Sequence, residues 1–197
     1  MKWVLMAAIG YLMGSVSFGI LISRQTANLD IRTVGSGGTG MTNVLRTLGK
    51  RMAAWVFAGD CLKGFVPALL GLYLGGEALG AVGGLAAVVG HSYPLYFGFK
   101  GGRGVATACG VMLALSPMVA VLALAVFWVV FLIGRWVSLA SIVGAVCAVV
   151  LAAVTRRPVS ILIMTAVCAV IIVYRHIPNI KRLLNGTEPK FTRAGKG

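Results

Sequence analysis

Long apolar runs alternate with short polar segments along the whole chain. The runs cover approximately residues 3–22, 52–74, 81–97, 105–115, 117–133, 137–154 and 159–175. About 20 consecutive apolar residues are enough for a helix to cross the hydrocarbon core of a bilayer. The pattern therefore predicts an all-α integral membrane protein with seven transmembrane helices, folded as a single polytopic domain over residues 1–197.

The division between the fourth and fifth runs rests on one dipeptide. The apolar stretch 105–133 is too long for one helix perpendicular to the membrane and too short for two full spans. Ser116-Pro117 lies near its middle, and proline fits the start of a helix while it disfavours helix in the preceding residue. We therefore expect a break there, and the alternative is one long, tilted and kinked helix.

The composition agrees with a membrane location and adds a strong positive charge. Apolar residues make up 59% of the chain, charged residues only 11%, and the formal net charge is +14. In a chain embedded in a bilayer, this excess indicates anionic lipids or an anionic substrate rather than nucleic acid. The four cysteines stand singly in apolar runs, and the two histidines and four acids are far apart in sequence. We therefore expect no metal site and no cofactor.

The cations are distributed unequally between the two sides of the predicted bundle. With seven spans, the segments 24–51, 98–104, 134–137 and 175–197 share one side and hold fourteen of the eighteen lysines and arginines. Loops rich in lysine and arginine stay in the cytoplasm. The charge pattern predicts an N-terminus outside the cell, a cytoplasmic C-terminus and cytoplasmic polar loops.

Two ionisable residues interrupt the second apolar run. Asp60 and Lys63 are three residues apart, which places them on the same face of a helix. Charged groups inside a membrane usually face a cavity or each other. We expect a structural ion pair between them, and direct contact with a substrate is the alternative.

The longest polar segment contains a glycine-rich block. Gly35 to Arg46 reads G-S-G-G-T-G-M-T-N-V-L-R. Glycines let backbone N–H groups approach an anion closely, and Thr42 or Asn43 is expected to cap a short helix that carries Arg46. The block is a candidate anion site, and a flexible glycine-rich loop is the simpler interpretation.

A second glycine-rich block separates the third and fourth runs. Gly98 to Thr107 reads G-F-K-G-G-R-G-V-A-T, with Lys100 and Arg103 among the glycines. Its spacing does not match the phosphate loop of nucleotide-binding proteins, but its cations and exposed N–H groups suit a phosphate. The simpler interpretation is a basic turn on the cytoplasmic side. We expect His91, shortly before this block, to be a hydrogen-bonded structural residue rather than a catalytic base.

Further polar residues fall on the same predicted side. Ser138 and Ser141 lie on one face of the sixth predicted span, and Arg175, His176 and Asn179 follow at the end of the seventh. A transporter usually has polar groups near the bilayer midplane and often internal repeats, and the sequence shows no convincing repeat. A site at the inner surface suits an enzyme that joins a water-soluble anion to a lipid.

These blocks together resemble the bacterial acyl-phosphate-dependent glycerol-3-phosphate acyltransferases of the PlsY type. The resemblance covers almost the whole chain and rests on three blocks in the same order, at 35–46, 90–107 and 174–186. The second reads G-H-x-Y-P-x-x-F-x-F-K-G-G-R-G-V-A-T, and the third reads Y-R-H-x-x-N-I-x-R-L-x-x-G. The chain departs from the family at Gly38, where asparagine is usual. It departs again at Arg103, where lysine is frequent, so a point donor becomes a planar fork with the same charge.

The resemblance implies transfer of a fatty acyl group from acyl phosphate to the 1-hydroxyl of glycerol 3-phosphate. The products would be lysophosphatidic acid and phosphate, in the first step of bacterial phospholipid synthesis. It also implies a multi-pass protein of the bacterial inner membrane with its active site facing the cytoplasm and the acyl chain between helices in the bilayer. We expect this enzyme to be a monomer.

The resemblance further implies candidate site residues in the glycine-rich blocks and at the ends of the last two spans. His176, Ser36 and Arg46 are the candidates for catalysis. The residues implied to bind the substrates or their phosphates are Gly35, Ser36, Gly37, Thr39, Gly40, Thr42, Asn43, Arg46, Lys100, Gly101, Gly102, Arg103, Gly104, Thr107, Ser138, Ser141, Arg175, His176 and Asn179.

Two mechanisms fit these residues. In the first, His176 removes the proton of the glycerol hydroxyl. In the second, which we favour, an oxygen of the acyl phosphate takes this proton, and His176 orients a phosphate. A different class of function, an anion channel or carrier that uses the same basic loops, is the remaining alternative.

Overall fold

The computed structural model describes residues 1–191, and these residues are all-helical, as predicted, with no strand among them. The α-helices are α1 Lys2–Gly14, α2 Phe18–Ala27, α3 Met41–Leu48, α4 Lys50–Ser92, α5 Val105–Leu115, α6 Pro117–Gly134, α7 Val137–Val154, α8 Val159–Arg175 and α9 Ile177–Leu184. Two 3-10 helices, η1 Ile31–Thr33 and η2 Leu95–Phe97, lie in the polar segments. Arg193 and Lys196, which the charge argument assigns to the cytoplasmic side, lie outside the described residues.

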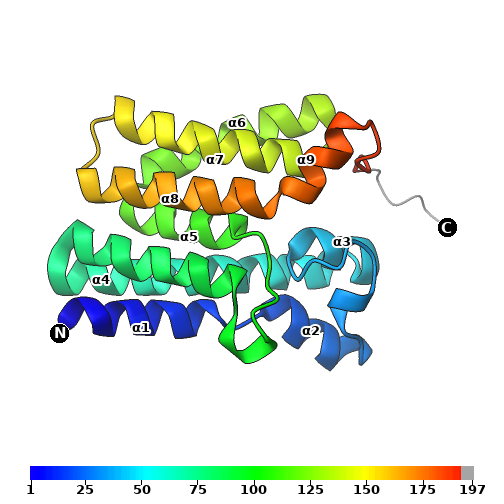
Figure 1. Cartoon of the computed structure of the whole chain (residues 1–197), viewed down its shortest axis with the longest axis horizontal. Helices are drawn as coiled ribbons and strands as arrows, with labels where there is room; N and C mark the ends of the chain where they lie inside the picture. The colour runs from blue at the N-terminus through cyan, green and yellow to red at the C-terminus, as the bar shows by residue number, and fades with distance from the viewer. Residues whose placement is uncertain (192–197) are drawn as a thin grey trace.

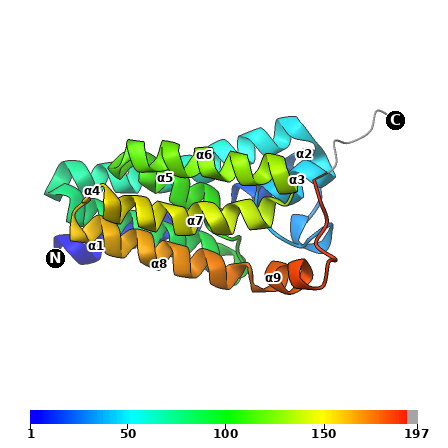
Figure 2. The same ribbon diagram turned by 90° about the horizontal axis from the view of Figure 1, so that it is seen from above.

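The long helices lie side by side along the long axis of the molecule (Figure 1 and Figure 2). α1 and α4 form one part of the bundle, α6, α7 and α8 form the other, and α5 lies between them. The short helices α2, α3 and α9 lie at the end opposite to the N-terminus. Polar segments that are far apart in the sequence therefore gather at one end of the bundle.

Two apolar clusters hold this arrangement together. The larger one joins the five helices α4, α5, α6, α7 and α8 through buried side chains that include Val111, Val119, Ile161 and Met164. The smaller one joins α2, η1, α3 and the start of α4 through Ile20, Ile31, Ala53, Val44 and Val56. The smaller cluster anchors the segment between α2 and α4 on the bundle, so the first glycine-rich block has a fixed support.

Within residues 1–191, four helical segments are long and apolar enough to cross a membrane: Lys2–Ala27, Lys50–Phe97, Pro117–Gly134 and Val137–Val154. A fifth is obtained if α8 and α9, which are bent by 57°, count as one span. The predicted span at 105–115 is too short for a full crossing, because 11 residues of helix measure about 16 Å and the hydrocarbon core is about 30 Å thick.

The predicted span at 3–22 lies within the apolar segment Lys2–Ala27, but it is not one continuous helix. α1 ends at Gly14 and α2 begins at Phe18, and the intervening Ser17 has an extended conformation. This break has hydrogen-bond partners from elsewhere in the chain. The side-chain hydroxyl of Ser15 accepts a hydrogen bond from the N–H of Leu95, and the backbone carbonyl of Val16 accepts one from a lysine of α4. The lysine thus replaces a hydrogen bond that this carbonyl would accept inside an unbroken helix.

α4 consists of two antiparallel arms, which correspond to the second and third predicted spans. The helix opens at Gly75 and Gly76, and Gly76 has a φ of 77°, in the left-handed region that favours glycine. The arms pack closely, because a Cβ on Gly80 would lie 2.8 Å from the Ala68 carbonyl. The second arm ends at Ser92 and not at residue 97 as predicted, because a proline at position 94 disfavours helix in the residue before it.

The apolar stretch 105–133 is divided at the predicted dipeptide. Ser116 has φ −154° and ψ 74°, outside helical geometry, and Pro117 is the first residue of α6. The last carbonyl of α5, that of Leu115, accepts a hydrogen bond of 2.9 Å from the guanidinium of Arg157. The start of α6 is thus stabilised by its own proline, and the end of α5 by a cation from the turn before α8.

Candidate functional site

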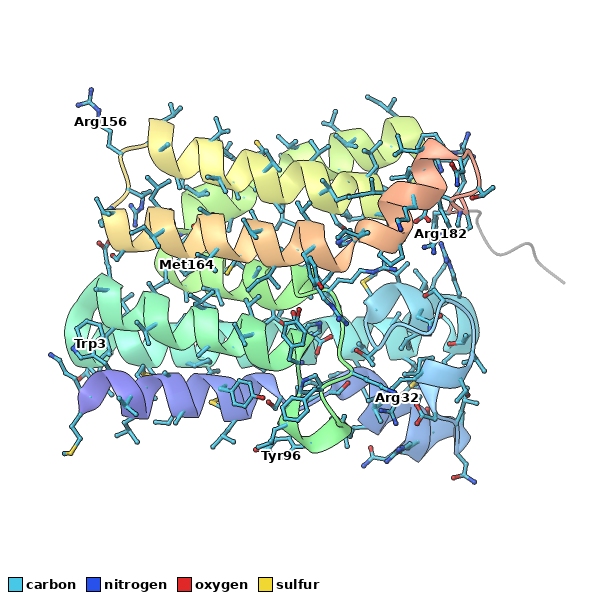
Figure 3. All side chains as sticks on the ribbon, in the orientation of Figure 1. Trp3, Arg32, Tyr96, Arg156, Met164 and Arg182 are labelled. Carbon is cyan, nitrogen blue, oxygen red and sulfur yellow. The ribbon has the colours of Figure 1, made fainter. Side chains whose placement is uncertain are left out.

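A polar cavity of about 320 Å³ lies at the end of the bundle where the polar segments meet. It is lined by the first glycine-rich block, the second glycine-rich block, the first turn of α7 and the junction of α8 with α9. Figure 3 shows Arg182 of α9 at this end of the molecule, whereas Trp3 and Arg156 lie at the other end. The cavity therefore collects residues from all three sequence blocks.

The first glycine-rich block is folded around the side chain of Asn43. Its Oδ1 accepts from the N–H of Ser36 at 2.9 Å, and its Nδ2 donates to the carbonyls of Ile31, Val34 and Gly38 at 2.9 to 3.0 Å. The side chain of Asn43 is thus committed to shaping the loop. The expected capping role of Thr42 or Asn43 is wrong, because the N-cap of α3 is Gly40 and both residues lie inside the helix.

The second glycine-rich block passes closely over the end of α4. A Cβ on Gly102 would overlap Nε2 of His91, and the N–H of Gly102 donates to the His91 carbonyl at 3.1 Å. Arg175 at the end of α8 donates to the carbonyls of Gly101 and Gly102 at 2.7 and 3.0 Å. Glycine is required at position 102 by this close approach, and Arg175 fixes the loop against α8.

The two cations of this block have different positions. Arg103 lines the cavity and is partly buried, whereas Lys100 is exposed and is not among the lining residues. Burial lowers the pKa of Arg103, Glu188 opposes this shift, and the nearby Arg182, Arg46 and Arg175 lower the pKa further. Arginine stays protonated in proteins, so this crowding of cations makes an anion favourable beside Arg103.

His176 lies at the bend between α8 and α9 and is almost completely buried. Its Nδ1 lies 2.8 Å from the Ile172 carbonyl, and because a carbonyl only accepts, Nδ1 carries the proton. Burial lowers the pKa of His176 to about 4, even though the hydrogen bond to Ile172 acts in the opposite direction. The ring is therefore neutral near pH 7, and its Nε2 is a hydrogen-bond acceptor.

A buried acid that the sequence patterns did not reveal lies at the edge of the cavity. Oε1 of Glu188 accepts from Ser138 and from Nδ2 of Asn179, both at 2.7 Å. Its Oε2 accepts from Arg182 at 2.7 Å. Arg182 was also missed, although a spacing of three from Asn179 on α9 places both on one face. Nothing in the sequence around Glu188 marks it, because it stands alone in a short tail after the last helix.

An apolar cavity of about 90 Å³ adjoins the polar one, between α5, α6, α7 and α8. Val105, Phe127 and Ser141 line both cavities. Deeper in the bundle the walls are formed by small or apolar residues, including Gly144 and Met164. Ser141 lies where the two cavities meet. Its hydroxyl donates to the Val137 carbonyl at 2.8 Å, so the hydroxyl proton is already used in a hydrogen bond.

The buried charges of α4 lie beside the polar cavity. Lys63 is 2.7 Å from Asp60, and both side chains are almost completely buried. Nδ1 of His91 is 3.6 Å from the same carboxylate oxygen. Asp60 and His91 line the polar cavity, and Lys63 does not. The structure therefore contains the expected ion pair, and it adds His91 as a close neighbour.

Most of the residues implied by the resemblance line the polar cavity. These are Ser36, Gly37, Thr39, Gly40, Thr42, Asn43, Gly101, Gly102, Arg103, Gly104, Ser141, Arg175, His176 and Asn179. Five others do not line it, namely Gly35, Arg46, Lys100, Thr107 and Ser138. Arg46 is exposed and donates to the Pro189 carbonyl at 3.4 Å, and the carbonyl of Thr107 lies against Gly64 of α4.

Comparison with known proteins gives one consistent family. The family model of glycerol-3-phosphate acyltransferases matches residues 4–186. The glycerol-3-phosphate acyltransferase of Aquifex aeolicus is 46% identical over 193 residues, which cover 97% of this chain and all of the relative. The corresponding protein of Geobacter sulfurreducens is 45% identical over 190 residues, or 95% of this chain and 97% of the relative.

Solved structures give the same result. The structure is similar to crystal structures of PlsY (YgiH), described as an integral membrane glycerol 3-phosphate acyltransferase. The glycerol 3-phosphate form superposes with a TM-score of 0.94 at 45% identity, and the lysophosphatidic acid form with 0.92 at 44%. Each alignment covers 98% of this chain and 96% of the other. On this evidence the chain belongs to the glycerol-3-phosphate acyltransferase family, in its integral membrane, PlsY-like branch.

Proposed function

We propose that this chain transfers a fatty acyl group from acyl phosphate to the 1-hydroxyl of glycerol 3-phosphate. The products are lysophosphatidic acid and inorganic phosphate. Membership of the family supports glycerol 3-phosphate as the acceptor and lysophosphatidic acid as the product, because the crystallised relative is described with each of them. The choice of acyl phosphate as the donor is supported by the sequence resemblance and by the chemistry of the two cavities.

One observation carries the proposal: the cation-lined polar cavity continues into an apolar cavity between helices. Val105, Phe127 and Ser141 belong to both walls. An acyl phosphate consists of a dianionic head and an apolar tail, so it needs both environments, joined at the reacting carbonyl. Arg103, together with backbone N–H groups of the glycine-rich blocks, suits the phosphate head, and the space beside Gly144 suits the tail.

The proposed reaction needs positioning and neutralisation of charge more than it needs a strong base. The hydroxyl oxygen of glycerol 3-phosphate forms a bond to the acyl carbon, and the bond from this carbon to the phosphate oxygen breaks. The hydroxyl proton goes to the departing phosphate, which leaves as a stable anion. Acyl phosphate is a mixed anhydride with a good leaving group, so held substrates and the cations around Arg103 supply most of the barrier reduction.

His176 has two roles that fit this reaction. It is neutral near pH 7, and Nε2 is its accepting nitrogen. It can hold the attacking hydroxyl in position through this acceptor, or it can also receive the proton as a base. We favour the first role, with the phosphate of the donor as the final proton acceptor. It replaces the phosphate-orienting role expected from the sequence, because an accepting Nε2 does not suit a phosphate. Ser36 and Thr39, in the loop opposite, complete the phosphate-binding wall.

We place the polar end of the bundle in the cytoplasm of a bacterium, at its inner membrane. The seven predicted segments then cross or enter the bilayer, with the N-terminus outside and the protein acting as a monomer. The concentration of cations at the polar end supports this orientation, because positively charged loops stay inside. Substrate enters from the cytosol, and the acyl chain lies within the bilayer.

The test uses purified protein with glycerol 3-phosphate and either acyl phosphate or acyl-CoA as the donor. We expect lysophosphatidic acid from acyl phosphate only. Product from acyl-CoA alone would reject the donor. In sealed vesicles, flux of phosphate without any acylated product would instead support the carrier. The Arg103→Ala variant, prepared in the same way, is the matched control for acyl transfer that does not use the site.

A further inference from the structure

Glu188 is a buried acid beside a cavity that is built to attract anions. Its side chain is only 6% exposed and accepts hydrogen bonds from Ser138, Asn179 and Arg182, all at 2.7 Å. The tail that carries it is held as well, because the Glu188 carbonyl accepts from Nε1 of Trp136 at 3.1 Å. Glu188 is therefore held in place through both its side chain and its backbone.

The other three acids of the chain have different partners. Asp30 pairs with Arg32, Asp60 with Lys63, and Glu77 with Arg157. Glu188 instead lies against α9 beside the polar cavity. A negative charge at this place opposes the binding of a phosphate dianion. Burial alone would raise the pKa of Glu188, but hydrogen bonds from Asn179, Ser138 and Arg182 outweigh burial and lower it. The carboxyl group is therefore ionised, and it can influence the site by fixing the positions of its three hydrogen-bond donors.

The contact with Glu188 decides which way the Asn179 amide points. A carboxylate only accepts hydrogen bonds, so the atom of Asn179 that faces it is Nδ2. Oδ1 must then occupy the other position. This oxygen is buried and has no hydrogen-bond partner, while Asn179 itself lines the polar cavity. A buried acceptor without a donor costs free energy, and a ligand that donates a hydrogen bond would satisfy it.

A second acceptor lies one helical turn away. His176 is three residues before Asn179 and lines the same cavity. Its Nδ1 is bonded to the Ile172 carbonyl, which leaves Nε2 as an acceptor. Phosphate groups near neutral pH mainly accept hydrogen bonds, whereas hydroxyl groups donate them. This pair of acceptors therefore suits the glycerol part of the substrate, and the arginines suit its phosphate.

We propose that Glu188 is a positioning residue for the acyl acceptor: it holds Nδ2 of Asn179, so that Oδ1 receives a hydroxyl of glycerol 3-phosphate. The inference rests on the proposed function, because it takes glycerol 3-phosphate as the ligand of this cavity. Glu188 does not contact the substrate itself. Its contribution is the orientation of an amide that would otherwise turn its N–H groups toward the phosphate.

The experiment measures the KM for glycerol 3-phosphate and competitive inhibition by inorganic phosphate, in full-length purified variants. Glu188→Ala is expected to raise the KM for glycerol 3-phosphate about tenfold, the loss of one hydrogen bond, and to leave inhibition by phosphate unchanged or stronger. Glu188→Gln is expected to stay within about threefold of the unmodified protein, because its Oε1 still accepts from Asn179. Adding Asn179→Ala to Glu188→Ala should raise the KM no further than Asn179→Ala alone.

Other results would overturn the proposal. A lower KM for glycerol 3-phosphate together with stronger inhibition by phosphate would show that Glu188 merely competes with the substrate phosphate. An equal weakening of both ligands, in Glu188→Ala and Glu188→Gln alike, would show a purely structural role. Failure of the proposed function is separate, since the unmodified protein would then give no lysophosphatidic acid in the same assay.

Discussion

Nζ of Lys63 on α4 donates to the carbonyl of Val16, in the break between α1 and α2, at a distance of 2.6 Å. The same ammonium lies 2.7 Å from Asp60. One buried cation thus neutralises an acid within α4 and satisfies the open backbone between α1 and α2. The ring of Phe18, whose centroid is 6.0 Å from this ammonium, covers the group. This relationship explains why the first apolar run is broken.

Replacement of Lys63 by methionine should therefore destabilise the fold strongly. The change leaves the Asp60 carboxylate buried without its partner, for which about 3–5 kcal/mol is typical. We expect a clear fall in the midpoint of thermal unfolding in detergent. Lys50→Met, at the exposed start of α4, is the matched control and should change the midpoint little. The double variant Asp60→Asn with Lys63→Met should recover part of the loss, and an unchanged midpoint in Lys63→Met would contradict this account.

The sequence was sufficient where local chemistry determines the structure. The all-helical fold follows from the apolar runs, and the break at Pro117 follows from the geometry of proline. The break at Ser15 to Ser17 could not be predicted, because its cause is a lysine on another helix. The end of the second arm of α4 at Ser92 has a local cause, Pro94, although the apolar run itself continues to residue 97.

The candidate site was predictable to the extent that its residues form blocks. Glycines and cations in two blocks indicated the loops around Arg103, spacing on a helix indicated Ser141, and the family resemblance indicated Asn179. The structure was needed to show that a lining residue can also shape the loop, as Asn43 does through its side-chain hydrogen bonds. Glu188 could not be found from sequence, because its role depends on the tail folding back onto α7 and α9.

Arg103 and Lys100 should differ greatly in their effect on activity. Arg103 lines the polar cavity, and loss of its charge-assisted hydrogen bonds should lower kcat/KM about 100-fold in Arg103→Ala. Lys100 is exposed, so Lys100→Ala should stay within about twofold. Arg103→Lys keeps the charge and should lie between these variants. Steady-state kinetics with both substrates checks the order, and an equal loss in the two alanine variants would refute it.

Substitution of His176 tests which group accepts the proton. If His176 orients the hydroxyl, His176→Gln should keep substantial turnover with a raised KM, because glutamine still offers an acceptor. Complete loss of turnover with unchanged substrate binding would instead identify His176 as the base. Turnover numbers and KM values for glycerol 3-phosphate separate these outcomes.

The pH dependence of the unmodified protein gives an independent check on His176. Burial lowers its pKa to about 4, below the usual value of 6.5. Protonation would remove the acceptor, so this loss should occur only as pH falls toward about 4 and not around pH 6.5. Dividing the kcat/KM of the unmodified protein by that of His176→Gln at each pH cancels the titration of the substrates. The ratio should remain constant from pH 8 to about 5.5, and a midpoint near 6.5 would contradict the neutral ring.

The apolar cavity can be tested as the site of the acyl chain by filling it. Gly144 on α7 lines this cavity, and a Cβ there would meet Phe127 at 3.4 Å, an ordinary contact. Gly144→Leu should therefore be tolerated by the fold but should occupy space beside Phe127. We expect kcat/KM for palmitoyl phosphate to fall about tenfold or more, because several buried CH₂ groups, each worth about 0.8 kcal/mol, lose their place.

The comparison with a short donor makes this prediction specific. Butyryl phosphate carries the same head group and should lose much less activity in Gly144→Leu, because its chain ends near the junction with the polar cavity. Val146→Leu, on the exposed face of the same helix, is the matched control and should leave both donors unaffected. An equal fall for both donors would place the defect in the polar cavity, whereas no fall for palmitoyl phosphate would show that the chain lies elsewhere. The ratio of the two kcat/KM values thus reports directly on the space between α6 and α7.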